Sequence, residues 1–168
     1  MAITLDGNNT GTVGVINSAT AVASTSGTSI DFTGIPSGVK RITVMFNAIS
    51  TSGSSILQVQ IGSGSVTTSG YSSLSSEIYS GVATTTATSG FIFYTNVAAA
   101  VCSGHMVLTN VSGNIWVSSH TIMNYTATAY AMVGSGTVTL GGVLDRVRVT
   151  TVNGTDTFDA GSINILYE

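Results

Sequence analysis

The sequence predicts an all-β protein, an antiparallel β-sandwich formed by one main domain. Two observations lead to this fold class. Apolar residues recur at every second position in short runs rich in Val, Ile, Thr and Tyr, and Gly, Ser or Asn bounds each run. No stretch shows the 3.6-residue apolar period of an amphipathic helix. A chain of 168 residues is also long enough to bury a hydrophobic core.

The alternation is clearest in residues 40–48, where Ile42, Val44, Phe46 and Ala48 share one face. One apolar and one polar face per strand is typical of antiparallel sheets. The same reasoning predicts further strands at residues 29–32, 57–61, 76–79, 90–94, 105–109, 115–120, 125–133, 137–140, 143–150 and 162–167. We expect one core between two sheets, made by Ile42, Val44, Phe46, Val147, Val149, Ile163 and Ile165.

Short polar connections separate these strands. Residues 51–55 are short enough for a hairpin, and residues 152–155 contain Asn153-Gly154, a pair that favours positive φ. About eight to ten short strands at regular spacing indicate a sandwich or barrel, and we expect a jelly-roll-like sandwich. An immunoglobulin-like fold is the alternative, but its Cys…Trp…Cys signature is missing, because Cys102 and Trp116 are single.

Two segments differ from the rest of the chain. Residues 62–89 are dominated by Ser, Thr and Gly, so we expect a loop-rich region there. Residues 1–26 carry isolated apolar positions among Gly, Asn, Thr and Ala, which suits an extended N-terminal arm. The predicted organisation is therefore an arm over residues 1–26, used for attachment, and a jelly-roll-like β-sandwich domain over residues 27–168.

The composition indicates assembly. Only 7% of the residues are charged, against about 25% in typical soluble domains. The net charge is −3 and the mean hydropathy is +0.44, yet no apolar run approaches the ~18 residues of a membrane span. We therefore expect no membrane insertion. A surface this poor in charge is adhesive, so we expect part of it to be buried against copies of itself or another protein.

The chain has four basic residues, which argues against nucleic acid as a partner. Two of them, Arg146 and Arg148, share one face of a predicted strand, where an anionic contact is the alternative to simple solvation. Cys102 is the single cysteine, so it forms no internal disulfide and is expected to be buried. Residues 1–7 lack a basic region followed by an apolar one, so we expect synthesis in a cytoplasm without a secretory signal.

The sequence offers no catalytic, cofactor-binding or metal site, and we predict a protein that is not an enzyme and needs no cofactor. Catalysis needs a nucleophile with its base, paired carboxylates or a metal cluster, and no such motif is evident. Asn153, Asp156 and Asp159 share a loop, which leaves a bound calcium ion open. His105 and His120 lie in predicted strands, where a metal on a trimer axis is the alternative to an ordinary strand histidine.

Three stretches carry a resemblance to known proteins. Residues 144–168, LDRVRVTTVNGTDTFDAGSINILYE, resemble the closing hairpin of many tailed-bacteriophage virion proteins. Residues 29–47, SIDFTGIPSGVKRITVMFN, resemble the opening strands of the same group, and residues 1–7 are similar to phage fibre N-termini. The group comprises head decoration (cement) proteins, head fibres and tail-fibre tips. It brings no catalytic residues with it.

The resemblance implies a structural protein on the virion surface, made in the host cytoplasm. The sequence contains no recognisable fibre shaft, whereas a compact sandwich with an arm suits a capsid decoration protein that stabilises the head shell as a homotrimer. Its partners would be its own copies and the major capsid protein or tail proteins. The first alternative is a tail-fibre tip that recognises a host surface glycan or receptor. The second is a carbohydrate-binding or adhesin sandwich, which an exposed Trp116 would favour.

Overall fold

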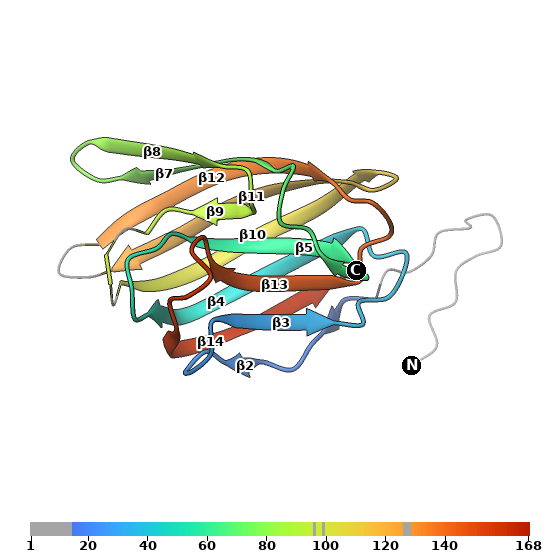
Figure 1. Cartoon of the computed structure of the whole chain (residues 1–168), viewed down its shortest axis with the longest axis horizontal. Helices are drawn as coiled ribbons and strands as arrows, with labels where there is room; N and C mark the ends of the chain where they lie inside the picture. Colours follow the sequence, from blue (N-terminus) through green and yellow to red (C-terminus); the bar gives the residue numbers. More distant parts are fainter. Residues whose placement is uncertain (1–14, 96, 99, 126–128) are drawn as a thin grey trace, which may run out of the picture.

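The computed structural model describes residues 15–95, 97–98, 100–125 and 129–168. Every helix or strand element in these residues is a β-strand, and all strand pairs are antiparallel. The strands form two sheets that face each other (Figure 1). The predicted class, an all-β antiparallel sandwich, is confirmed.

The larger sheet has nine strands in the order β1-β14-β4-β10-β11-β12-β7-β8, with β2 also paired to β14. Its long strands read IWVSSHTIMNY and similar alternating sequences, which suit a sheet with one buried face. Their bounds are β1 Asn17–Ser18, β2 Val22–Ala23, β4 Arg41–Thr51, β7 Ser72–Ile78, β8 Val82–Ala87, β10 Val101–Ser112, β11 Ile115–Tyr125, β12 Ala129–Thr139 and β14 Phe158–Tyr167.

The smaller sheet has five strands, β3-β13-β5-β6 with β9 also paired to β5. Its strands are β3 Ser29–Thr33, β5 Leu57–Ser63, β6 Ser65–Val66, β9 Phe91–Phe93 and β13 Arg146–Thr151. The narrower sheet covers only part of the larger one, so β7 and β8 extend past it (Figure 1).

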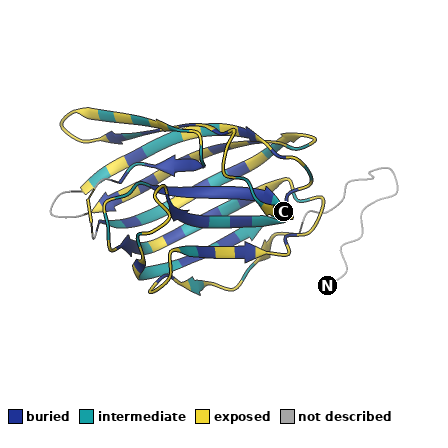
Figure 2. Ribbon diagram, viewed as in Figure 1, coloured by how far each residue is buried: buried dark blue, intermediate teal, exposed yellow. Residues whose placement is uncertain are grey.

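The predicted core residues all belong to one buried cluster. Phe46 lies at its centre, with its ring 4.9 Å from that of Phe93 on the opposite sheet. Figure 2 shows the buried residues concentrated on the strands that face each other, while exposed residues gather on the outer strands. Burying seven large aliphatic and aromatic side chains between two sheets is the main source of stability of such a fold.

Ala48 departs from the prediction. Its φ of 51° places it in the left-handed region, and the β4–β14 register shifts between Ala160 and Ser162. Gly161, with φ 88°, lies so close to Ala48 that a Cβ would clash with its carbonyl. This bulge moves Ile49 rather than Ala48 into the core, where Ile49 is fully buried.

Neither predicted hairpin joins paired strands. Residues 51–55 connect β4 in the larger sheet to β5 in the smaller one, and residues 152–155 connect β13 to β14 across the same gap. The positive φ is present at Gly154, which takes 68°. A turn sequence fixes local backbone angles, but packing decides whether the following strand stays in the sheet or crosses over.

Residues 62–89 hold three strands, β6, β7 and β8, so the expected loop-rich region is wrong. The strand predicted at residues 125–133 is right for residues 129–133, which belong to β12, but Tyr125 is the last residue of β11, and residues 126–128 lie outside the described residues. The strand predicted at residues 137–140 is not separate: residues 137–139 are the last residues of β12. Val143 is exposed because β13 starts only at Arg146.

The described part of the predicted arm follows the edge of the larger sheet. Asn17 and Ser18 pair with Tyr167 and Leu166, and Val22 and Ala23 pair with Ile163 and Ser162. The Ser24 hydroxyl donates to the Ala160 carbonyl oxygen, 2.7 Å away. Residues 17–24 therefore contact their own chain through β14. Residues 1–14 lie outside the described residues.

Candidate functional site

The arginines that the sequence placed on one strand face are both paired. On β13, Arg148 Nε lies 2.7 Å from Asp31 Oδ1 of β3, and Arg146 Nε lies 2.7 Å from Asp145 Oδ1. The Arg146 guanidinium and the Gly64 N–H hold the pKa of Asp145 below its usual value. Each guanidinium already faces a carboxylate, so neither arginine offers an uncompensated charge to an anionic ligand.

The loop considered for calcium is a hydrogen-bonded turn. Asn153 Oδ1 accepts from the Thr155 N–H, and Asn153 Nδ2 donates to Asp156 Oδ1 at 2.7 Å. Asp156 Oδ2 accepts the Ser55 N–H, which ties this corner to the neighbouring one. These contacts use the loop oxygens to fix the two crossovers between the sheets. The described residues contain no cluster of three or more His, Cys, Asp or Glu that could hold a metal ion.

The two histidines lie on opposite faces of the larger sheet. His105 on β10 is exposed on the outer face, opposite Met45 and Thr121 on the neighbouring strands. His120 on β11 is buried between the sheets, and the Phe93 ring packs against it edge-on at 6.4 Å. Burial lowers the pKa of His120 to about 4, so its imidazole is neutral at pH 7.

His120 belongs to a buried polar cluster that the sequence did not predict. Its Nε2 lies 3.2 Å from Ser75 Oγ on β7, across Gly134 of β12. Gly134 makes room for the ring, because a Cβ there would lie 2.4 Å from the His120 Cε1 atom. A serine hydroxyl beside an imidazole is a nucleophile–base pair in outline. Ser75 is, however, fully buried and also accepts the Tyr94 N–H, so this pair stabilises the packing of the sheets.

Two serines of β7 accept hydrogen bonds from backbone N–H groups that would otherwise need a neighbouring strand. Ser73 Oγ accepts the N–H of Ile92, and Ser75 Oγ accepts that of Tyr94, both from the segment around β9. These bonds satisfy backbone donors at the edge of the smaller sheet, which would otherwise be costly to bury. They also close the sandwich on this side by tying the two sheets together.

Glu77 completes the cluster. It is buried, and its Oε1 accepts from Asn124 Nδ2 at 3.3 Å. Burial raises the pKa of Glu77, and the Asn124 hydrogen bond opposes that rise. Burial, helped by the nearby Glu77, raises the pKa of the Cys102 thiol to about 12, which keeps it protonated and unreactive. Cys102 is fully buried, as predicted.

The candidate site is the outer side of the larger sheet, opposite this buried cluster, and we call it the neutral face. It is the outward surface of β10, β11, β12, β7 and β8. The only charged residue in these five strands is Glu77, and Glu77 points inward. Surfaces with this little charge lose little solvation when another protein covers them, and charged residues are depleted at the centres of protein interfaces.

The neutral face also exposes large apolar side chains. Register places Met123, Ala131, Ile78 and Val82 in one row that crosses four strands. Two-thirds of the Val82 surface is accessible. Seven exposed large apolar residues lie on this face: Leu74, Ile78, Val82, Ile115, Val117, Met123 and Tyr125. Large apolar residues exposed in this number on one uncharged face are a feature of protein interaction surfaces.

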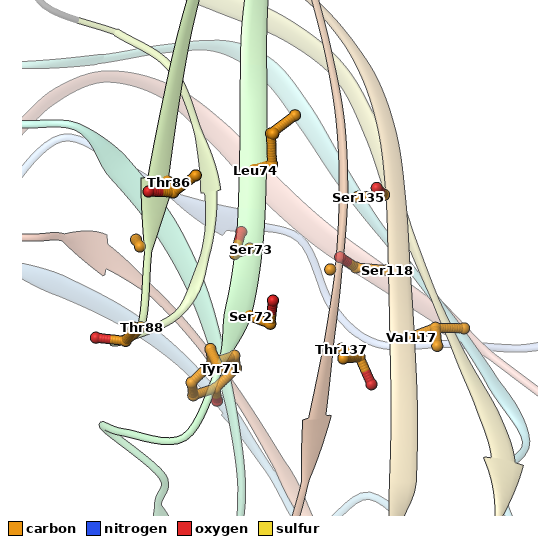
Figure 3. A pocket seen from close by; sticks show the side chains of 12 residues that line it. Tyr71, Ser72, Ser73, Leu74, Thr86, Thr88, Val117, Ser118, Ser135 and Thr137 are labelled. Carbon is orange, nitrogen blue, oxygen red and sulfur yellow. The ribbon is translucent and has the colours of Figure 1, made fainter.

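An open hollow of about 840 Å³ lies on the neutral face. Figure 3 shows its lining side chains, which come from β7, β8, β11 and β12 and from Tyr71 and Thr88 next to β7 and β8, and which are mostly hydroxyls and short apolar groups. Tyr71 borders the hollow but is buried, and its hydroxyl accepts the Ile61 N–H. Trp116 is only 3% exposed. The exposed tryptophan that would have favoured a carbohydrate-binding protein is therefore not present.

No protein-family model matches this chain, and no curated protein or solved structure is significantly similar to it. The described residues contain no helix that is long and apolar enough to cross a membrane.

Proposed function

We propose that this chain is a structural protein of the tailed-bacteriophage virion surface, a head decoration protein that binds the shell as a trimer. The neutral face carries the proposal. A face without charge and with seven exposed apolar residues is suited to burial against copies of the chain, and closed symmetry would cover it in every copy. Of the predicted arm, residues 1–26, only the part before Asn17 would reach the shell, because residues 17–24 contact β14 of the same chain.

Strand order supports this assignment. Eight strands follow the jelly-roll order, with β3-β13-β5-β9 facing β4, β12, β7 and β8. Two additional strands, β10 and β11, lie between β4 and β12, and β14 lies outside β4. We infer a jelly roll enlarged by three strands. The jelly roll is a common architecture of viral capsid proteins.

The proposal is tested by placing a charge at the centre of the neutral face. Ser135 on β12 is exposed and lies opposite Ser119 of β11 and Leu74 of β7. Ser135→Lys should leave the chain folded, abolish the trimer and weaken binding to phage heads that lack the wild-type protein, because three linked contacts become one. Thr155→Lys, at the exposed corner between β13 and β14, is the matched control and should bind heads normally.

A tail-fibre tip remains the alternative, and the hollow on the neutral face is the feature that favours it, because a concave surface suits a receptor. The same experiment separates the two roles when host cells are offered beside heads. Binding to cells but never to heads would replace the decoration role. Head binding unaffected by Ser135→Lys would contradict the role of the neutral face.

A further inference from the structure

The strands at the edges of the two sheets are protected very unequally. A free edge exposes unpaired N–H and C=O groups, and proteins normally blunt it with charge, shortness, bulges or a covering segment. Here β1, β2 and β6 are two residues long, β3 carries Asp31 paired with Arg148, and the side chains of Ser73 and Ser75 cover the edge beside β9. In contrast, β8 is six residues long, VATTTA, with no charge, proline or bulge.

The hydrogen-bond pattern shows which groups of β8 are free. The Tyr79 N–H donates to the Gly81 carbonyl oxygen, which makes these opposite residues a hydrogen-bonded pair at the β7–β8 turn. Bonded pairs alternate along an antiparallel ladder, so Ala83, Thr85 and Ala87 bond to β7. A second hydrogen bond leads to the same assignment. The Leu140 N–H donates to the Asn114 carbonyl oxygen, and alternating the bonded pairs from β11–β12 through β12–β7 again leaves Ala83, Thr85 and Ala87 bonded to β7.

It follows that Val82, Thr84 and Thr86 direct their N–H and C=O groups away from the sheet. All three residues are exposed. Their spacing is symmetric about Thr84. An identical strand running in the opposite direction can therefore place Thr84 opposite its own copy and Val82 opposite Thr86, which gives every free N–H and C=O a partner.

We propose that β8 pairs with β8 of a second copy of this chain, antiparallel and about a twofold axis at Thr84. Two uncharged edge strands can approach each other without electrostatic repulsion. No other edge strand in the described residues is both regular and without a protecting charge, bulge or covering segment. The contact extends the larger sheet into the second copy with the same antiparallel pairing as all its strands. It also places exposed Val82 beside Thr86 of the copy, a favourable pair of β-branched residues.

This contact is separate from the trimer proposed above. A twofold edge contact joins two copies of whatever unit the rest of the surface builds: two chains give a dimer, and two trimers give a hexamer. Loss of head binding by Ser135→Lys would leave the β8 contact in place, so either proposal can fail alone.

Disulfide cross-linking tests the register directly. Opposite residues in a bonded pair have Cα atoms about 5.5 Å apart, within the range that a disulfide spans. Thr84→Cys should therefore form a covalent dimer under mild oxidation. Thr86→Cys is the matched control: its copy would lie four residues away along the strand, about 13 Å, and should stay uncross-linked. Mixing Val82→Cys with Thr86→Cys chains should restore the cross-link. Buried Cys102 should not contribute.

A second variant blocks the contact without a cysteine. Thr84→Pro removes an N–H that faces the free edge, so the chain should stay folded but lose the twofold association in sedimentation. Thr85→Pro removes an N–H bonded to β7 and should disrupt the β7–β8 hairpin instead. The proposal is overturned if Thr84→Cys yields no covalent dimer, or if Thr84→Cys and Thr86→Cys cross-link equally.

Discussion

The outer surfaces of the two sheets differ in how they carry charge. On the smaller sheet, Asp31 of β3 pairs with Arg148 of β13, and Asp145 pairs with Arg146 at the start of the same strand. On the larger sheet, the neutral face carries no charged side chain over five strands. Charges keep a surface hydrated, and the comparison therefore indicates which face is suited to remain in water and which to be covered.

The interior also differs behind the two faces. Behind the charged face, β13 and β5 turn Val147, Val149, Val59 and Ile61 inward, and all four are fully buried. Behind the neutral face, β7 and β11 turn Ser75, Glu77, His120 and Asn124 inward. Ser73 and Ser75 accept backbone N–H groups of the segment around β9, Ser75 also bonds to His120, and Glu77 bonds to Asn124, while the apolar side chains of β7 face outward. The interior behind the neutral face thus combines these buried polar groups with buried apolar side chains of β10, β11 and β12, among them Met106, Ile122 and Met132.

The largest loss of stability should come from substituting Phe46, which packs between the two sheets. Phe46→Ala removes a buried ring that packs on Phe93, and we expect it to lower the free energy of unfolding by about 3–5 kcal/mol. Met45→Ala, on the outer side of the same strand, is the control and should cost far less. Chemical denaturation of both variants provides the measurement. An unchanged midpoint for Phe46→Ala would show that the two faces do not share one core.

Acid should weaken the region behind the neutral face. The pKa of His120 is about 4 in the folded protein and about 6.5 when unfolded, so the unfolded state binds the proton first. The stabilising contribution of neutral His120 is complete above pH 6.5 and is lost as the pH falls to 4, amounting to about 3 kcal/mol. Glu77 acts in the opposite sense, because its raised pKa makes ionisation costly as the pH rises.

Unfolding curves between pH 4 and 7 separate these contributions. His120→Gln should flatten the acid-side loss relative to the wild-type protein, whereas His105→Gln on the outer face should keep it. Equal pH dependence in the wild-type protein and His120→Gln would mean that His120 does not titrate as a buried group.

The smallest effect should come from the charged face. Arg148 and Asp31 are each more than a third exposed, and exposed ion pairs contribute about 0.2–1 kcal/mol. Arg148→Ala should therefore lower stability only slightly, and less so in high salt. Thermal melts at two salt concentrations provide the check. A large, salt-independent loss would mean that this pair is structural and that the contrast between the faces is misplaced.

Much of the fold could be predicted from the sequence, because period-two alternation marks strands whose apolar side faces the core. Ile42, Val44, Phe46, Ile163 and Ile165 follow that rule and are buried. For the neutral face, the sequence predicted only that the chain as a whole is poor in charge, since 7% of its residues are charged. The location of this face could not be read, since composition does not say which strands lie together.

The segment that holds β7 shows why the remainder was missed. Its outward residues are Leu74, Ser76 and Ile78, and its inward ones are Ser73, Ser75 and Glu77. A hydrophobic pattern assigns the apolar set to the core, the opposite of the structure. The inward serines are needed because the backbone around β9 has no neighbouring strand on one side. This requirement arises from tertiary structure, and the local sequence of β7 does not reveal it. Alternating serines at Ser73 and Ser75 were the one visible trace.

The association state of the wild-type protein shows whether the neutral face is covered in an assembly. Sedimentation velocity at micromolar concentration, with Ser135→Lys measured beside it, gives the answer. We predict a trimer for the wild-type protein, or a hexamer when the β8 contact also forms, and loss of the threefold unit for Ser135→Lys. A wild-type protein that sediments as a clean monomer would contradict the account.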